Sequence, residues 1–330
     1  MSNRRDFMSL GAAMAVICAS GGGSVNAQTP KTKDRAGFFQ DIWPGNPPGG
    51  GKVTAAEEVI LRNPKGGNPD DTAFLHVRKP WLVVRKPAKP NGAAMLIMPG
   101  GGYVRVAVSK AGGDIDAWLA SEGITTFTMD YRLPADGWAA GPDVALQDAQ
   151  RAIRIIRARS AELGIDPERI GVIGFSAGGH VAGLLATRWA EKSYAPIDAI
   201  DQQSARPAVV AMMYPVVTMM APYAHGGSLK ELLGSAPSDA ARQASSVERH
   251  VTADTPPTFV GGTTDDPVVP MQNAILMFEA LKAAKIPSEL HLYEGATHGF
   301  PLHNSKGDLM PWAAPTLSFL RRHGLDAAKS

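Results

Sequence analysis

The feature that most constrains the fold is an alternation, between residues 81 and 323, of short apolar runs and segments with helical spacing. The helical segments repeat apolar side chains every three or four positions, whereas the short runs are typical of buried strands. The predicted strands are 81–84, 93–98, 124–130, 170–175, 207–217, 258–262 and 288–293, and the predicted helices are 112–123, 144–159, 178–189, 271–285 and 312–323. Strands separated by helices need crossover connections, so the sequence predicts an α/β fold with a mainly parallel sheet and helices on both faces.

Two segments depart from this alternation. Residues 28–52 are rich in proline and glycine, and we expect an irregular lead-in that packs on the domain through Trp43. Residues 218–251 are predicted to form a small insertion above the carboxyl ends of the strands, where chemistry collects in such sheets. The remainder, 53–330, is predicted to be a single catalytic domain.

Residues 1–27 have the pattern of an export signal. Arg4 and Arg5 precede the apolar run 10–19, and "VNA" at 25–27 offers a small-x-small cleavage pattern. "NRRDFM" resembles a twin-arginine signal, and the apolar run is shorter than the roughly 20 residues that span a bilayer. The sequence therefore predicts a periplasmic or secreted protein without membrane attachment after cleavage. Cys18, the only cysteine, lies inside this segment, so the mature chain would contain no thiol.

Charge and residue spacing exclude several function classes. The 33 basic and 31 acidic residues are scattered along the chain and give a net charge of +2. Proteins that bind nucleic acid concentrate positive charge to neutralise phosphates, so nucleic acid is not an expected partner. No H-E-x-x-H or similar ligand spacing occurs, and we expect neither a metal nor another cofactor. The oligomeric state stays open.

The stretch "GFSAG" places Ser176 between Gly174 and Gly178, at the junction of a predicted strand and a predicted helix. This is the G-x-S-x-G pattern of a nucleophile elbow, a strained turn in which glycine avoids collisions on either side of the serine. The turn exposes the hydroxyl at the carboxyl end of the sheet. Ser176 is therefore the predicted nucleophile, the alternative being a serine that only caps the helix.

A serine nucleophile needs a base and a carboxylate that orients the base. In chain order these follow the serine as acid and then histidine. His298 lies between predicted loop residues directly after the strand 288–293, and we predict it as the base. Asp265 and Asp266 both follow the strand 258–262. Asp265 is the first of the two after that strand and is the favoured acid, with Asp266 as the alternative.

Backbone amides are needed to stabilise the negative oxygen of a tetrahedral intermediate. "PGGGY" at 99–103 ends an early strand in glycines, so amides can approach an acyl oxygen without side chains in the way. We predict an oxyanion hole from Gly100, Gly101 and Ala177. Aromatic residues near the strand ends, among them Tyr103 and Tyr131, are candidates for the lining of a substrate cleft.

Taken together, "PGGGY", "DYRLP", "IDPERIGVIGFSAGGHVA", "DDPVVP" and "THGF" resemble the α/β-hydrolase fold, and within it the esterases related to hormone-sensitive lipase and to bacterial acetyl xylan and feruloyl esterases. Pro99 stands where the lipase-like members carry histidine, which favours the carbohydrate esterases. The resemblance implies removal of acetyl or feruloyl groups from plant polysaccharide such as xylan through an acyl-serine. The alternatives are a general short-chain carboxylesterase or lipase, an exported peptidase, and an inactive carbohydrate-binding homologue.

Overall fold

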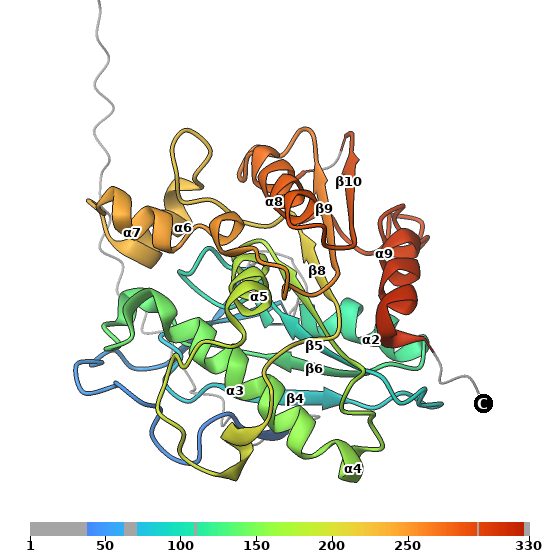
Figure 1. Cartoon of the computed structure of the whole chain (residues 1–330), viewed down its shortest axis with the longest axis horizontal. Helices are drawn as coiled ribbons and strands as arrows, with labels where there is room; N and C mark the ends of the chain where they lie inside the picture. Colours follow the sequence, from blue (N-terminus) through green and yellow to red (C-terminus); the bar gives the residue numbers. More distant parts are fainter. Residues whose placement is uncertain (1–37, 63–70, 109–110, 296, 327–330) are drawn as a thin grey trace, which may run out of the picture.

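The computed structural model describes residues 38–62, 71–108, 111–295 and 297–326, so the predicted export signal lies outside the described residues. The described chain forms an eight-stranded sheet and a separate two-stranded antiparallel ribbon (Figure 1). The strands of the large sheet are β1 Phe38–Asp41, β4 Trp81–Arg85, β5 Ala94–Met98, β6 Thr125–Met129, β7 Ile170–Phe175, β8 Val210–Met213, β9 Thr258–Thr263 and β10 Ser288–Tyr293. The ribbon pairs β2 Glu58–Leu61 with β3 Thr72–Leu75.

The helices alternate with these strands along the chain. They are α2 Asp116–Ser121, α3 Val144–Ala158, α4 Ser160–Leu163, α5 Ala177–Arg188, α6 Gly226–Leu233, α7 Asp239–Ala244, α8 Gln272–Ala283 and α9 Ala313–Leu320. A π-helical turn at Ala111–Ile115 leads into α2, so this helix begins later than the predicted residue 112.

The strand order in the large sheet is β1-β4-β6-β5-β7-β8-β9-β10. β4 runs antiparallel to β6 and β1 antiparallel to β4, while all pairs from β6 to β10 are parallel. The predicted mainly parallel α/β sheet is therefore confirmed. Because parallel strands point the same way, the segments after β5, β7, β9 and β10 all leave from one edge of the sheet.

Alternate side chains of the central strands enter separate hydrophobic clusters on the two faces. On β5, Leu96 and Met98 belong to the cluster formed with α3, α5 and α8, whereas Met95 and Ile97 belong to the cluster formed with α2 and α9. Figure 1 shows α3 and α5 lying across the sheet. Helices thus cover both faces, as predicted, and the central strands are buried up to the edge where the chemistry is expected.

The N-terminal segment is more ordered than the predicted irregular lead-in. Phe38–Asp41 forms β1 and pairs with β4, so the folded domain includes residues before the predicted boundary at 53. Trp43 is buried, as predicted, and its indole Nε1 donates to Asp148 Oδ1 at 2.6 Å. Asp148 also forms a fully buried ion pair with Arg132 at 2.7 Å. This network ties the N-terminal segment to the end of β6 and to α3.

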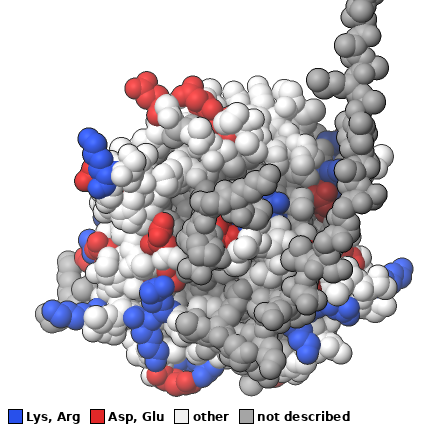
Figure 2. Space-filling model, turned by 180° about the vertical axis from the view of Figure 1, so that it is seen from behind, with Lys and Arg blue, Asp and Glu red and all other residues white. Residues whose placement is uncertain are grey.

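The features that remain are the surface charge, possible membrane-spanning helices and possible metal-binding clusters. On the face drawn in Figure 2, acidic and basic side chains are interspersed among the described residues. Within the described ranges no helix has the length and apolar character to cross a membrane, and no group of three or more histidine, cysteine, aspartate or glutamate residues could hold a metal ion.

Candidate active site

Ser176 occupies a sharp turn between β7 and α5. Its backbone has φ 54° and ψ −120°, a region that L-residues rarely adopt. Neighbouring strands hold this strained turn, because the Ser176 amide donates to the carbonyl of Met213 at 3.0 Å and its carbonyl accepts from Val216 at 3.1 Å.

The two glycines of the elbow lie where no side chain fits. A Cβ on Gly174 would stand 2.2 Å from the carbonyl oxygen of Gly178, and a Cβ on Gly178 would stand 2.2 Å from the carbonyl oxygen of Met98. The second contact shows that α5 packs directly on the end of β5. The sequence therefore uses glycine to bring the serine turn against the loop that follows β5.

His298 and Asp266 complete a hydrogen-bonded line with the serine. Ser176 Oγ lies 2.8 Å from His298 Nε2, and His298 Nδ1 lies 2.7 Å from Asp266 Oδ2. The other oxygen of Asp266 accepts from the amides of Val268 and Val269 at 2.8 and 2.9 Å, and its side chain is only 3% exposed. A carboxylate fixed by two amides holds the imidazole with its Nδ1 protonated, so Nε2 is free to accept a proton from Ser176.

The favoured assignment of Asp265 as the acid is wrong, and Asp266 takes that position. The Asp265 carboxylate is in the exposed part of the loop, where Oδ2 accepts from the Gly295 amide at 2.9 Å and from Thr264 Oγ1 at 3.1 Å. It therefore fastens the loop after β9 to the loop after β10. The chain turns between the two aspartates, so only the second carboxylate faces His298.

Ser176 and His298 open into a cavity of about 460 Å³, and Gly100 and Gly101 also line it. A Cβ on Gly100 would lie 3.0 Å from Ser176 Cβ, so the glycine backbone passes directly beside the nucleophile. The amides of Gly100, Gly101 and Ala177 are not paired with any described carbonyl. Ala177 is also the first residue of α5, whose positive end favours a developing negative charge. Gly100 and Gly101 thus lie beside the nucleophile and Ala177 follows it directly, while the role of the three amides as oxyanion donors stays a prediction.

Tyr103 and Tyr131 do not line the cavity, which corrects their assignment as substrate contacts. Both are buried, at 1% and 0% exposure. The Tyr131 hydroxyl donates to the Pro99 carbonyl at 2.7 Å, and the Tyr103 hydroxyl lies 2.7 Å from His180 Nδ1. Both tyrosines therefore hold the glycine loop 99–103 in place. Tyr131 bonds to Pro99 at the start of the loop, and Tyr103 at its end bonds to His180.

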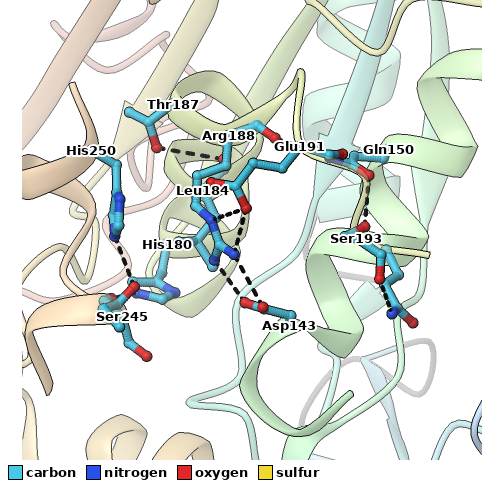
Figure 3. A network of polar contacts seen from close by, with 12 residues as sticks. Asp143, Gln150, His180, Leu184, Thr187, Arg188, Glu191, Ser193, Ser245 and His250 are labelled. Atoms are coloured by element: carbon cyan, nitrogen blue, oxygen red, sulfur yellow. Dashed lines mark hydrogen bonds and ion pairs between the residues drawn. The ribbon is translucent and has the colours of Figure 1, made fainter. Parts of the chain in front are cut away.

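His180 connects this support to the insertion. Its imidazole is fully buried, and its Nδ1 lies 2.7 Å from the Tyr103 hydroxyl. Its Nε2 lies 2.8 Å from the carbonyl of Ser245, a residue that Figure 3 shows beside the ring. Because a carbonyl can only accept, Nε2 carries the proton and Nδ1 accepts from the tyrosine. Burial lowers the pKa of His180 to about 4, so the ring is neutral at physiological pH. Further along α5, Arg188 pairs with Asp143 and Glu191 in the same view.

Three residues around the cavity were not predicted as site residues. Tyr214 follows β8 and packs the edge of its ring on His298, with ring centres 5.1 Å apart. His225 reaches the cavity from the segment 218–251, which places part of that segment over the site, and burial together with the nearby His298 lowers its pKa. Arg105 follows the glycine loop 99–103 and also lines the cavity. Only Tyr214 had a usable signal, namely its place at a strand end, and the predicted strand 207–217 was too long to reveal it.

The chain is similar to known proteins over more than half of its length. Residues 83–281 match the BD-FAE family. The chain is 33% identical over 218 residues to endo-1,4-beta-xylanase B of Butyrivibrio fibrisolvens, and 28% identical over 229 residues to an acetylxylan esterase of Xylanibacter ruminicola. These alignments cover 64% and 67% of this chain, but the chain spans only 33% and 44% of the two relatives.

Solved structures give the same fold. An acetyl ester-xyloside bifunctional hydrolase from Caldicellulosiruptor lactoaceticus has a TM-score of 0.60 at 36% identity, covering 73% of this chain and 84% of that one. The esterase Est2 of Thermogutta terrifontis has a TM-score of 0.63 at 28% identity, covering 79% and 95%, and its structure was also solved with propionate and with butyrate bound. Since the family match takes in more than half of the sequence, the chain belongs to the BD-FAE family of α/β-hydrolases.

Proposed function

We propose that this chain is a serine carboxylic-ester hydrolase that works through an acyl-enzyme. The observation that carries the proposal is the continuous hydrogen-bonded line from Ser176 through His298 to Asp266, which opens into a cavity beside unpaired amides. The esterases among the relatives and structural neighbours support the same reaction class.

The geometry accounts for each step of the reaction. His298 Nε2 takes the proton of Ser176 while Oγ attacks the ester carbonyl, and the imidazolium is stabilised by Asp266. The amides of Gly100, Gly101 and Ala177 stabilise the oxyanion. His298 then passes its proton to the departing alcohol, which leaves an acyl-serine. A water molecule, deprotonated by the same imidazole, hydrolyses this ester and restores the free hydroxyl.

The substrate we propose is acetylated plant cell-wall polysaccharide such as xylan, with feruloyl esters as the alternative acyl group. Support comes from the names of the relatives, which include a xylanase and an acetylxylan esterase. We also propose that the protein is exported to the periplasm or secreted, because residues 1–27 have the pattern of a twin-arginine signal. An extracellular polymer would be accessible there.

A second candidate is a short-chain carboxylesterase without a polysaccharide substrate. The likeness to Est2, solved with propionate and butyrate, favours it. Initial rates of acetate release from acetylated xylan, compared with acetylated pectin and p-nitrophenyl acetate, separate the two candidates. Turnover of the aryl ester alone would support the second.

The reaction class itself is tested by a fluorophosphonate probe and by Ser176→Ala. We expect the probe to form one adduct, on Ser176, and the variant to lose at least about 10⁴-fold in kcat because the nucleophile is gone. A folded protein that binds xylan oligosaccharides but takes up no probe would contradict the proposal and indicate an inactive binding homologue.

A further inference from the structure

The cavity beside Ser176 contains a positive charge that the reaction described above does not use. Arg105 lies two residues after the glycine loop 99–103 and lines the cavity. The Nε atom of Arg105 is buried and has no hydrogen-bond partner, and the guanidinium forms no ion pair with a described carboxylate. A buried donor without an acceptor is energetically unfavourable. Arg105 as a whole is half-buried and lines the cavity, so a bound molecule can reach its side chain.

The buried arginines of the described chain have their acceptors. Arg132 pairs with Asp148, Arg151 pairs with Asp198 and Asp201, and Arg157 donates to backbone carbonyls. Arg105 is half-buried, and its buried Nε has no such acceptor among the described residues. It lies at the place where a substrate would bind.

The second arginine of the cavity is already neutralised. Arg62 forms a two-pronged ion pair with Asp71, with distances of 2.7 and 2.9 Å. Asp114 also lines the cavity, but it is exposed and is not ion-paired with Arg105. Among the described lining residues, Arg105 is therefore the arginine whose charge is available to a bound molecule.

The position of Arg105 is fixed by the loop that carries the oxyanion donors. Its amide donates to the Gly101 carbonyl, and its Cγ would lie 3.2 Å from a Cβ placed on Gly101. The next residue, Val106, is bonded to Phe74 in both directions at 2.8 and 2.9 Å. The side chain thus extends from an anchored backbone into the cavity that Ser176 also lines, which suits the recognition of a group on the bound ester.

We propose that Arg105 forms an anion subsite that binds a carboxylate carried by the ester substrate. The planar guanidinium matches a carboxylate with two parallel hydrogen bonds, which a neutral acetyl or hydroxyl group cannot reproduce. This inference rests on the proposed ester hydrolysis and adds the substrate class to it. The carboxylate belongs either to the sugar part, as in a uronic acid, or to the acyl part, as in a dicarboxylic acid monoester.

The test uses two pairs of esters that differ in charge. The sugar pair is acetylated p-nitrophenyl glucuronide and its methyl ester, and the acyl pair is mono-p-nitrophenyl glutarate and p-nitrophenyl butyrate. We expect Arg105→Met to lower kcat/KM for the anionic member of one pair by about 10- to 100-fold and to change the neutral members by less than about threefold. The affected pair identifies the source of the carboxylate. Arg105→Lys, which keeps the charge without the fork, should lose less than Arg105→Met.

Lys230→Met is the matched control, because it removes an exposed positive charge of α6 that lies outside the cavity. We expect it to leave the ratio of anionic to neutral turnover unchanged in both pairs. An unchanged ratio in Arg105→Met, or an equal loss for both members of a pair, would overturn the anion subsite and leave ester hydrolysis standing.

A binding measurement keeps the two proposals separate. If the wild-type protein hydrolyses none of the four esters, the proposed function fails, and calorimetric titration with glucuronate and with glutarate then decides the subsite. Binding of either anion by the wild type that is lost in Arg105→Met supports the inference. Absence of binding of both by the wild type overturns it.

Discussion

Asp265 and Asp266 are consecutive in the sequence, yet their carboxylates have different partners. Asp266 contacts His298 Nδ1 and two loop amides, whereas Asp265 contacts the Gly295 amide. An asparagine at 266 could turn its amide group toward Nδ1 and leave the proton on Nε2, where it blocks transfer from Ser176. We expect Asp266→Asn to lower kcat on p-nitrophenyl acetate by about 10²- to 10⁴-fold.

Asp265→Asn is the control for that variant, since it changes a carboxylate one position away that is not in contact with the imidazole. We expect its kcat to stay within about threefold of the wild type, because only loop contacts are altered. Comparable losses in both variants would contradict the assignment of Asp266.

His180 makes folding stability depend on pH. Its pKa is lowered to about 4 by burial, whereas an unfolded histidine titrates near about 6.5. As the pH falls from 6.5 toward 4, the unfolded chain binds a proton that the folded chain does not. The free energy of unfolding therefore decreases over this window, by up to about 3 kcal/mol from this group, and the loss ends below about pH 4.

Urea unfolding of the wild type and of His180→Gln at pH 7.5, 6 and 5 measures this contribution. The variant is expected to be less stable at pH 7.5, because Tyr103 and Ser245 lose their partner, but its stability should fall less between pH 7.5 and 5. Identical slopes for the two proteins would show that His180 does not titrate in this way.

The sequence located the nucleophile and base because each has a local signature. Ser176 has glycines two positions away on both sides, and His298 follows a strand end. The acid had no such signature, since the choice between two adjacent carboxylates depends on the direction of one turn. Tyr103 and Tyr131 were misassigned because a strand-end position does not reveal whether an aromatic ring faces the cavity or the core.

At the scale of elements, the contact between α5 and β5 depends on Gly178. A methyl group there would stand 2.2 Å from the Met98 carbonyl and 2.4 Å from the Pro99 carbonyl, both of which are backbone atoms. We expect Gly178→Ala to destabilise the protein by about 2 kcal/mol or more, because α5 must shift away from the glycine loop 99–103. The same shift should lower kcat.

Gly226→Ala is a suitable comparison, because nothing lies within 4 Å of the added methyl group at the start of α6. Alanine favours helix, so we expect the melting temperature to stay the same or rise slightly. Circular dichroism melting and esterase rates on both variants give the answer. A Gly178→Ala protein as stable as Gly226→Ala would show that the helix adapts without strain.

Elements with strong periodicity were predictable, whereas short ones in proline-rich surroundings were not. The predicted strands 170–175 and 288–293 match β7 and β10 residue for residue. The strand predicted at 207–217 is observed only as Val210–Met213, because Tyr214 has a positive φ of 37° and Pro215 follows. β1 has only four residues beside a Pro- and Gly-rich stretch, so its pairing with β4 could not be inferred from local pattern.

At the scale of the whole molecule, the buried group of Trp43, Arg132 and Asp148 joins segments that are far apart in the sequence. Arg132 and Asp148 are both 0% exposed. Removing one partner of a buried pair leaves an uncompensated charge, so we expect Asp148→Ala to lower the free energy of unfolding by about 3 to 5 kcal/mol.

Glu162→Gln breaks an exposed ion pair, between Glu162 and Arg159, and serves as the control. Surface pairs contribute little, so the urea midpoint of this variant should stay close to that of the wild type. Equal effects of the two variants would mean that the N-terminal segment is not fastened through Asp148. The network of Trp43, Arg132 and Asp148 could not be predicted from a local sequence pattern. The overall α/β architecture could, because it follows from the alternation of strands and helices.

The location of His298 has a consequence for the thermal inactivation of this protein. His298 follows β10, which closes the sheet, pairs only with β9 and has no fully buried position. Local unfolding would begin at this edge strand and displace His298 from Ser176 while the central strands are still folded. Heated samples should therefore lose esterase activity at temperatures where tryptophan fluorescence still shows a folded core.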